Sequence, residues 1–386
     1  MIFFDRIIIS YFFVLCYTEI VKNNFREEFA MNKKLKVGVV GLGGILTNAH
    51  MIGYNMLKDK VEIAAVCDIV PEKIKGFKER FGYQDIPGFT DYKELLKVEG
   101  LDFIDICTPN YLHSIIAVDA LNAGLHVFCE KPDAVSVEDA ERMREAAERN
   151  NRHLMVMRNN RHRATAKYLK QYIADGNMGD IYCGRCGWQR RRGIPGKGGW
   201  FTTKAQSGGG PLIDLGVHMI DLAIWLMGNP TPVSVSGCTY TKFANSNISD
   251  SEHSKFGEKV ADGTFDVEDL AMGFVRFDNG ACLQIEFSWA SNVEEERVFV
   301  ELRGDKAGFE FKNGALKIFT ETDGKLVDLE PMPINGNWGH EYNMVHFVDV
   351  LLGDAEPDFT PTQGVNMIKI LEAIYKSAET GMEIRL

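Results

Sequence analysis

Residues 35–46 read LKVGVVGLGGIL. The first six residues are a short, β-branched apolar run, as expected of a buried parallel strand. A glycine turn follows, and residues 48–58 have the composition of a helix. This order predicts a dinucleotide-binding unit, in which Gly41 permits the tight turn and Gly43 lets a pyrophosphate approach the backbone. The expected cofactor contacts are Gly41, Gly43, Gly44 and Ile45, whereas Leu46 replaces the usual Gly or Ala at the third position of the motif.

Asp68 indicates which dinucleotide is bound. Residues 61–67 are apolar and run into Asp68, about twenty residues beyond the glycine motif. A carboxylate at this place accepts hydrogen bonds from the ribose hydroxyls and repels a 2′-phosphate. The next residues are Ile69, Val70 and Pro71, so no arginine follows to hold such a phosphate. The sequence therefore favours NAD over NADP.

The first half of the chain alternates between strand-like and helix-like segments. Strands are expected at residues 101–107, 125–129 and 153–157, and helices at 71–81, 92–97, 113–123 and 137–150. This alternation predicts an α/β fold with a doubly wound parallel sheet (a Rossmann fold), whose ligands lie at the carboxyl ends of the strands. The polar residues at those ends are further candidate cofactor contacts: Thr108, Asn110, His113, Glu130 and Lys131.

Two features carry the candidate chemistry. The first is Lys131, which follows a buried strand and precedes Pro132. The second is an expected helix at residues 212–227, which follows the glycine loop 208–210. Asp214 and His218 in this helix are four residues apart, so we expect them to share one helical face.

Taken together, these motifs resemble the Gfo/Idh/MocA family, the group of glucose–fructose oxidoreductase and inositol dehydrogenase. The resemblance extends from the vicinity of Lys36 to the C-terminus. It rests on Gly-Leu-Gly-Gly-Ile at 41–45, Thr-Pro-Asn at 108–110 with His113, Glu-Lys-Pro at 130–132, and Gly-Gly-Gly at 208–210 with Asp214 and His218. The departures are Leu46 and the stretch before Met31.

The resemblance implies a nucleotide domain followed by an α/β domain with a large, open, mostly antiparallel sheet. We expect residues 31–157 to form the NAD-binding domain and residues 158–386 to bind the substrate and mediate oligomerisation. Residues 1–30 are interpreted as an extension, because a clean first strand begins soon after Met31. A broad sheet with one covered face must hide the other, so a homodimer or homotetramer is expected.

The family also implies an oxidoreductase that transfers a hydride between a secondary carbinol and nicotinamide. Lys131, Asp214 and His218 are then expected around the reacting hydroxyl. His218 is assigned as the general base, because imidazole titrates close to neutrality. Lys131 would stabilise the developing alkoxide, and Asp214 would orient the substrate or His218. Proton transfer through Lys131 is the alternative.

The expected substrate is a sugar, an inositol or a glycoside, with ring C3 as the preferred position of oxidation. A second hypothesis is a glycoside hydrolase or lyase that keeps NAD bound and oxidises its substrate transiently. A third is a dinucleotide-binding regulator without catalysis, against which the presence of Lys131, Asp214 and His218 together argues.

Several residues are candidate substrate contacts beyond the catalytic three. Arg158 and Asn160 follow the last strand of the first domain, and Trp200 lies in the glycine-rich segment 190–207 before the catalytic helix. We expect this segment to form a wall or lid of the substrate site, with Trp200 stacking on a sugar face. Its three successive arginines, at 190–192, are interpreted as a solvated or subunit-contact patch rather than a grip for an acidic group.

Composition limits the partners and the compartment. The 386 residues carry a net charge of −11, and an acidic surface disfavours nucleic acid and anionic membranes. The eight cysteines lie mostly in apolar runs, which predicts reduced thiols and a cytoplasmic protein. Cys183 and Cys186 stand alone in a predicted strand, where positions three apart point to opposite faces, so no metal is expected there.

Overall fold

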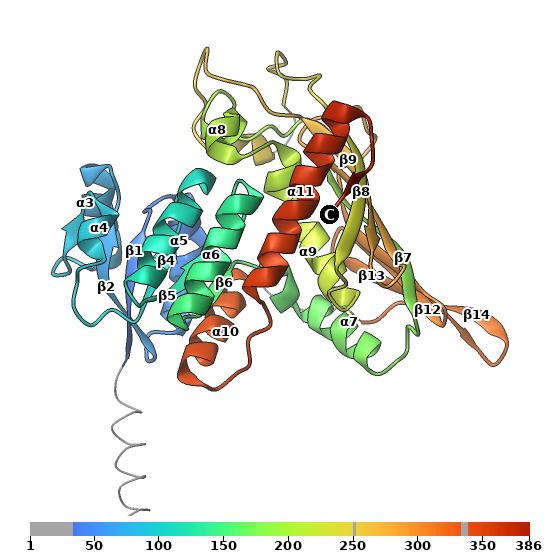
Figure 1. Cartoon of the computed structure of the whole chain (residues 1–386), viewed down its shortest axis with the longest axis horizontal. Coiled ribbons are helices and arrows are strands. Elements are labelled where there is room, and N and C mark those ends of the chain that lie inside the picture. Colours follow the sequence, from blue (N-terminus) through green and yellow to red (C-terminus); the bar gives the residue numbers. More distant parts are fainter. Residues whose placement is uncertain (1–33, 250–251, 333–338) are drawn as a thin grey trace, which may run out of the picture.

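A computed structural model describes residues 34–249, 252–332 and 339–386. The predicted extension, residues 1–30, lies outside this range. The described chain forms two sheets, one of six strands and one of nine, with helices packed between them (Figure 1).

The six-stranded sheet is fully parallel. Its strand order, 3-2-1-4-5-6, is that of the doubly wound dinucleotide-binding fold, and it confirms the fold class predicted from sequence. The strands in this order are β3 (Gly88–Phe89), β2 (Val61–Cys67), β1 (Leu35–Val40), β4 (Phe103–Ile106), β5 (His126–Cys129) and β6 (Leu154–Val156). The strand β3 was not predicted, because two residues are too short to show a pattern.

The helices of this half begin close to the predicted positions. They are α3 (Pro71–Phe81), α4 (Tyr92–Leu95), α5 (His113–Asn122) and α6 (Val137–Asn150). The charged helix α6 begins where the Ser136 hydroxyl accepts the backbone N–H of Asp139, and it ends at Asn151 in the left-handed conformation. The helix after the glycine turn differs from expectation, because a π-helical turn, η1 (Leu46–His50), precedes α2 (Met51–Met56).

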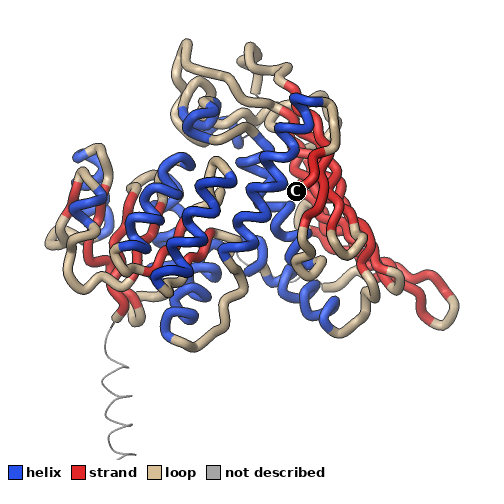
Figure 2. Tube along the Cα trace, in the orientation of Figure 1, coloured by secondary structure: helices blue, strands red, loops and turns tan. Residues whose placement is uncertain are grey.

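The nine-stranded sheet is antiparallel apart from the parallel pair β7 and β10. Its order is β14 (Lys325–Leu329), β13 (Ala315–Thr322), β12 (Ala307–Lys312), β11 (Arg297–Gly304), β7 (Ile181–Gln189), β10 (Cys282–Ser288), β9 (Leu270–Phe277), β8 (Pro232–Tyr240) and β15 (Ile384–Arg385). The edge strands β14 and β15 were not predicted from sequence. Helices cover the side of this sheet that faces the first half, and none is seen over its outer side in Figure 2.

The catalytic helix lies in the centre of the molecule. The stretch Lys204–Leu226 contains α8 (Lys204–Ser207), the π-helical turn η5 (Leu212–Gly216) and α9 (Val217–Leu226). By length and composition it is apolar enough to cross a bilayer, yet 83% of its most apolar window is buried inside the protein. Its apolar character therefore serves the packing of α9 against β7 and β11.

Two C-terminal helices return to the nucleotide-binding half. Helix α10 (His340–Leu352) packs beside α2, and α11 (Pro361–Thr380) lies beside α6 (Figure 1). Between β6 and β7 the chain forms the short turn η3 (Asn159–His162) and α7 (Ala164–Ala174). The two sheets are thus joined by helices from far along the sequence as well as by the direct connection.

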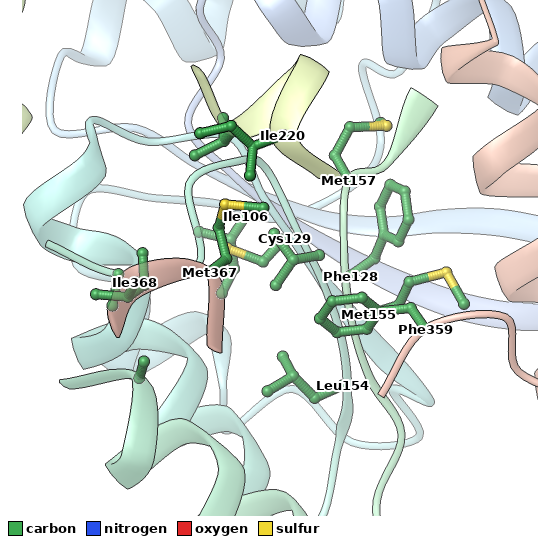
Figure 3. Close-up of a cluster of buried hydrophobic side chains, with 14 of the residues drawn as sticks. Ile106, Phe128, Cys129, Leu154, Met155, Met157, Ile220, Phe359, Met367 and Ile368 are labelled. Atoms are coloured by element: carbon green, nitrogen blue, oxygen red, sulfur yellow. The ribbon is translucent and has the colours of Figure 1, made fainter. Parts of the chain in front are cut away.

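The core is shared between the two halves. Figure 3 shows side chains from β4, β5 and β6 meeting Ile220 of α9 and Met367 and Ile368 of α11. All of these side chains are buried, with Ile106 and Cys129 fully enclosed at the ends of β4 and β5. Close packing here fixes the end of β5, which precedes Lys131, relative to helix α9, which carries His218.

Candidate active site

The glycine turn after β1 has the shape that a phosphate-binding loop needs. Gly41 has φ of +96°, and a Cβ on it would lie 2.5 Å from the carbonyl oxygen of Cys107. A Cβ on Gly43, by contrast, would meet nothing within 4 Å, so the backbone is open on that side. Gly44 and Ile45 open the following helix, whose first N–H groups have no intrahelical acceptor and suit an anionic ligand.

Asp68 ties the loop to the end of β2. One carboxylate oxygen accepts the backbone N–H of Leu42 at 2.9 Å, and the other accepts that of Val70 at 3.0 Å. Each oxygen retains a lone pair for a further donor, so the carboxylate is able to accept ribose hydroxyls while it holds the loop.

A buried hydroxyl without a hydrogen-bond partner in the described part of the chain lies just beyond the end of β4. The hydroxyl of Thr108 is buried and has no hydrogen-bond partner among the described residues. An orphaned buried hydroxyl beside the glycine turn fits a bound cofactor that supplies the missing partner. Asn110 already has a partner, because its amide donates to the carbonyl of Ser207 at 2.8 Å and so joins the two halves.

His113 has a structural role, contrary to our prediction. It is fully buried, and its two ring nitrogens lie 2.9 Å from the carbonyl oxygen of Thr108 and 2.8 Å from that of Pro132. Neither nitrogen is left for a cofactor. The ring instead fastens the segments that follow β4 and β5 to each other.

Glu130 contacts a buried histidine rather than solvent. Its carboxylate lies 2.8 Å from Nε2 of His50, and Nδ1 of the same ring lies 2.9 Å from Asp105, which also accepts the hydroxyl of Tyr54 at 2.8 Å. Burial by itself lowers the pKa of His50, but the negative charge of Asp105 raises it well above its ordinary value. Burial opposes ionisation of Glu130 too, yet the hydrogen bond and charge of His50 lower its pKa to about 2.

The same cluster has the composition of a metal site. A ring nitrogen of His50, an oxygen of Asp105 and the sulfur of Cys107 all lie within 4.8 Å of one another. The nitrogen and oxygen are already hydrogen bonded to each other, and the sulfur lies 3.4 Å from His50 Nδ1. We therefore interpret the cluster as a hydrogen-bond network.

Lys131 and Asp214 meet at the junction of the two halves. The Lys131 ammonium donates to the Asp214 carboxylate at 2.9 Å and to its backbone carbonyl at 3.1 Å. The indole N–H of Trp289 donates to the second carboxylate oxygen at 3.0 Å. Burial raises the pKa of Asp214, but the charges of Lys131 and Arg190 and these hydrogen bonds lower it to about 2. The pair is thus an ion pair held in place by a tryptophan.

His218 is a neutral imidazole beside this ion pair. Burial, and then the positive charge of Lys131, hold its pKa well below the ordinary value, although Asp214 acts in the opposite direction. The ring of Trp188 lies 6.2 Å from the His218 ring, between centroids. Asp214 lies in the π-helical turn that precedes α9, a local feature often found at functional sites.

Residues 35–158 match the family described as "Oxidoreductase family, NAD-binding Rossmann fold", and residues 166–310 match "GFO/IDH/MocA C-terminal domain". The chain belongs to the Gfo/Idh/MocA family. The resemblance inferred from the sequence motifs is therefore confirmed, as is a Rossmann domain for NAD.

Relatives and solved structures agree with this family assignment. The D-glucoside 3-dehydrogenase of Escherichia coli (strain K12) is 32% identical over 91% of this chain and 97% of its own. The glucose-6-phosphate 3-dehydrogenase of Bacillus subtilis (strain 168) is 27% identical over 77% of this chain and 80% of its own. A structure of levoglucosan dehydrogenase in complex with NADH and levoglucosan shares the fold, with a TM-score of 0.79, 23% identity, and coverage of 92% of this chain and 99% of that one.

Arg158, a predicted substrate contact, is held inside the protein by two carboxylates. It is 3% exposed and forms ion pairs with Asp133 at 2.6 Å and Asp221 at 3.0 Å. Asn160 is equally buried, and its amide donates to the backbone carbonyl of His218 at 3.4 Å. Arg158 thus bridges two buried carboxylates, whereas the Oδ1 of Asn160 is buried without a hydrogen-bond partner among the described residues and stays available to a ligand.

The tryptophans near the site were not the one predicted. Trp200 stacks on Phe201, with ring centroids 3.9 Å apart, in the wall segment. Trp188 and Trp289 instead contact His218 and Asp214. Neither contact has a signal in the sequence, because Trp188 lies within strand β7 and Trp289 directly follows strand β10.

Other site residues missed from the sequence are His50, Asp105 and His340. Of the three, Asp105 could have been recognised from the sequence, because it is a charged residue within an otherwise apolar strand, β4. His50 follows the glycine motif, and His340 opens α10 near the opposite end of the chain. Burial lowers the pKa of His340, and Glu130, His50 and Lys131 are among the charges that act on it.

Proposed function

We propose that this chain is an NAD-dependent dehydrogenase that transfers a hydride between a secondary carbinol of a sugar, an inositol or a glycoside and nicotinamide. The observation that carries the proposal is the ion pair of Lys131 and Asp214 beside neutral His218, in a chain whose first half matches an NAD-binding Rossmann fold. Relatives of this chain are named as dehydrogenases of glucosides and sugar phosphates, which supports the substrate class.

The residues divide the work at the hydroxyl. Oxidation removes a hydride from the carbon and a proton from the oxygen, and leaves a ketone. Bound NAD supplies the hydride acceptor. His218 accepts the proton, because its pKa lies well below the ordinary value and the ring is therefore unprotonated at neutral pH. Lys131 donates a hydrogen bond to the oxygen as negative charge develops there.

Asp214 sets the position of the Lys131 ammonium. Its two contacts with the ammonium hold Nζ in place, while the N–H of Trp289 fixes the carboxylate. The carboxylate also favours the imidazolium that forms when His218 accepts a proton. Lys131 is the alternative route for that proton.

Ring C3 is the proposed position of oxidation. Support comes from the names of two relatives, a D-glucoside 3-dehydrogenase and a glucose-6-phosphate 3-dehydrogenase. The product would be a 3-keto sugar, which mass spectrometry identifies after reduction with borodeuteride by the position of the deuterium.

The test is the absorbance of reduced nicotinamide with NAD and a panel of sugars, inositols and glycosides. Growth of the absorbance with substrate supports the proposed dehydrogenase and identifies its substrate. Product formation without that growth indicates that NAD is recycled in place, as in a hydrolase or lyase. Absence of any product across the panel while NAD binds contradicts the proposal and favours a regulator.

We propose that the protein is a homodimer or homotetramer built through the outer side of the nine-stranded sheet. That side carries no helix in Figure 2, and a broad sheet with one open side is commonly covered by another subunit. Light scattering on the purified protein measures the mass, and a monomer at micromolar concentration contradicts this proposal.

We propose a cytoplasmic location. The seven cysteines in the described part of the chain are free thiols, which suits a reducing compartment. Cell fractionation tests the proposal, and recovery with a secreted or membrane fraction would contradict it.

A further inference from the structure

Arg190 is a buried cation beside the catalytic ion pair. It follows directly after β7 and is 5% exposed, whereas the sequence led us to expect the arginines 190–192 together on a solvated or subunit-contact patch. Its Nη1 donates to the carbonyl of Gly193 at 3.2 Å, and its Nε has no hydrogen-bond partner among the described residues.

The guanidinium of Arg190 also lacks a direct counter-ion. Burial lowers the pKa of Arg190 to about 10, and Asp214 and Glu296 only partly offset this effect. Neither carboxylate forms an ion pair with it in the described structure. A guanidinium has five N–H donors, and a buried one without an anion is costly, so the site is suited to a ligand that supplies acceptor oxygens.

The two following arginines differ from Arg190. Arg192 donates to the carbonyl of Ser291 at 2.8 Å and to the side chain of Asn292 at 2.7 Å, and its guanidinium lies over the ring of Phe243. Arg191 is exposed, with its backbone N–H on Glu296. Of these three arginines, Arg190 is the buried one, and the charge of Asp214 acts on it.

Trp188 links Arg190 to the catalytic base. Its ring centroid lies 5.1 Å from the Arg190 guanidinium carbon and 6.2 Å from the centre of the His218 ring. Arg190 and His218 therefore lie on the same aromatic ring, that of Trp188.

The backbone of Arg190 is fixed by neighbouring serines. Its N–H donates to the carbonyl of Ser288 at 2.9 Å, and its carbonyl accepts the hydroxyls of Ser288 at 3.4 Å and Ser291 at 3.0 Å. These bonds fix the main chain at Arg190, while the contact with Gly193 and the ring of Trp188 hold its guanidinium before a ligand arrives.

We propose that Arg190 binds an anionic group of the substrate, a carboxylate or a phosphate attached to the sugar ring. The inference rests on the proposed function, because it takes the oxidised ring to lie between His218 and the wall segment. A carboxylate or phosphate offers paired oxygens to the planar donors of a guanidinium, and such charge-assisted bonds are about twice as strong as neutral ones. Arg190 then selects sugar acids or sugar phosphates over neutral sugars.

The experiment compares three probes on the full chain loaded with NADH: glucuronate, glucose 6-phosphate and the neutral methyl glucoside. Calorimetry measures their dissociation constants for the parent, Arg190→Gln, Arg190→Lys and the exposed control Arg191→Gln. We expect an anionic probe to bind the parent roughly 10- to 100-fold tighter than methyl glucoside. Arg190→Gln should abolish this preference, Arg190→Lys should retain part of it, and Arg191→Gln should leave it unchanged.

The outcomes distinguish a carboxylate from a phosphate as the bound group, and they also test the proposal itself. A preference for glucuronate assigns a carboxylate, and one for glucose 6-phosphate assigns a phosphate. The proposal is overturned if both anionic probes bind the parent no tighter than methyl glucoside, or if neither binds measurably at millimolar concentration. It is also overturned if Arg190→Gln weakens the binding of all three probes equally. NADH fluorescence verifies that each variant is folded. The binding preference is measured without turnover, so failure of the dehydrogenase assay leaves this test intact.

Discussion

Replacing His50 by leucine should destabilise the protein and impair catalysis together. The imidazolium is fully buried between two carboxylates, at 2.9 Å from Asp105 and 2.8 Å from Glu130. Leucine removes the positive charge and leaves both carboxylates in the interior. Removal of one partner from a buried ion pair typically lowers the free energy of unfolding by about 3–5 kcal/mol.

Urea unfolding, followed by tryptophan fluorescence, measures this loss. The matched control is Tyr54→Phe, which removes one hydrogen bond to Asp105 and leaves the bridge through His50 intact. That change should cost only about 1 kcal/mol. Equal unfolding free energies for His50→Leu and Tyr54→Phe would show that the charge of His50 is not needed.

The network should also give the stability a defined pH dependence. The raised pKa of His50 provides stabilisation that is complete below its unfolded value of about 6.5 and is lost as pH rises through the folded pKa. The lowered pKa of Glu130 provides stabilisation that is complete above its unfolded value of about 4.3 and is lost as pH falls toward about 2. The difference between parent and His50→Leu should therefore be largest between about pH 4.3 and 6.5.

His50 is linked to activity through Glu130, which precedes Lys131 in the chain. Glu130 accepts the backbone N–H of Lys131 at 3.1 Å, so a Glu130 released by His50 would no longer hold the following residue. We expect kcat to fall in His50→Leu while the dissociation constant of NAD changes little. A variant with unchanged kcat would refute the link between the network and the position of Lys131.

Lys131→Met should lower kcat by about 10²- to 10⁴-fold, because the variant loses the donor that stabilises the alkoxide. NADH should still bind, because the glycine loop is unchanged; near-normal turnover would exclude the role assigned to Lys131. The acid limb of kcat/KM should lie below pH 6.5, since the neutral form of His218 is active and its lowered pKa keeps it neutral to more acidic pH; a limb above this pH would argue for another base. Asp68→Ala should raise the ratio of kcat/KM with NADP to that with NAD by about 10-fold or more, as the repulsive carboxylate is removed; an unchanged ratio would contradict that role. Gly41→Ala should lower both stability and NAD affinity, because its Cβ would lie 2.5 Å from a carbonyl oxygen at φ of +96°; thermal unfolding and NADH fluorescence measure both.

The sequence by itself determined the features that depend on near neighbours. The glycine turn, the strand ending at Asp68 and the strand preceding Lys131 are short-range patterns, and each lies where it was expected. The boundaries of α3 and α6 were predicted closely for the same reason, since apolar periodicity and end residues are local properties.

Tertiary structure decided which polar residues face the ligand. His50, Asp105 and Glu130 are separated by 55 and 80 residues in sequence, measured from His50, and only the packing of η1 against β4 and β5 brings them together. His113 and Arg158 looked like ligand contacts from their positions at strand ends, but packing turned their polar groups toward carbonyls and carboxylates.

The arginines 190–192 show the same limit within consecutive residues. Three identical side chains in a segment without regular secondary structure show no hydrophobic periodicity. The sequence therefore did not distinguish the buried Arg190 from the two arginines that follow it. The backbone of Arg190 is bonded by Ser288 and Ser291, which lie 98 and 101 residues away in the sequence. Local sequence determined the elements of this protein, whereas the environment of each charge depended on contacts between residues far apart in the sequence.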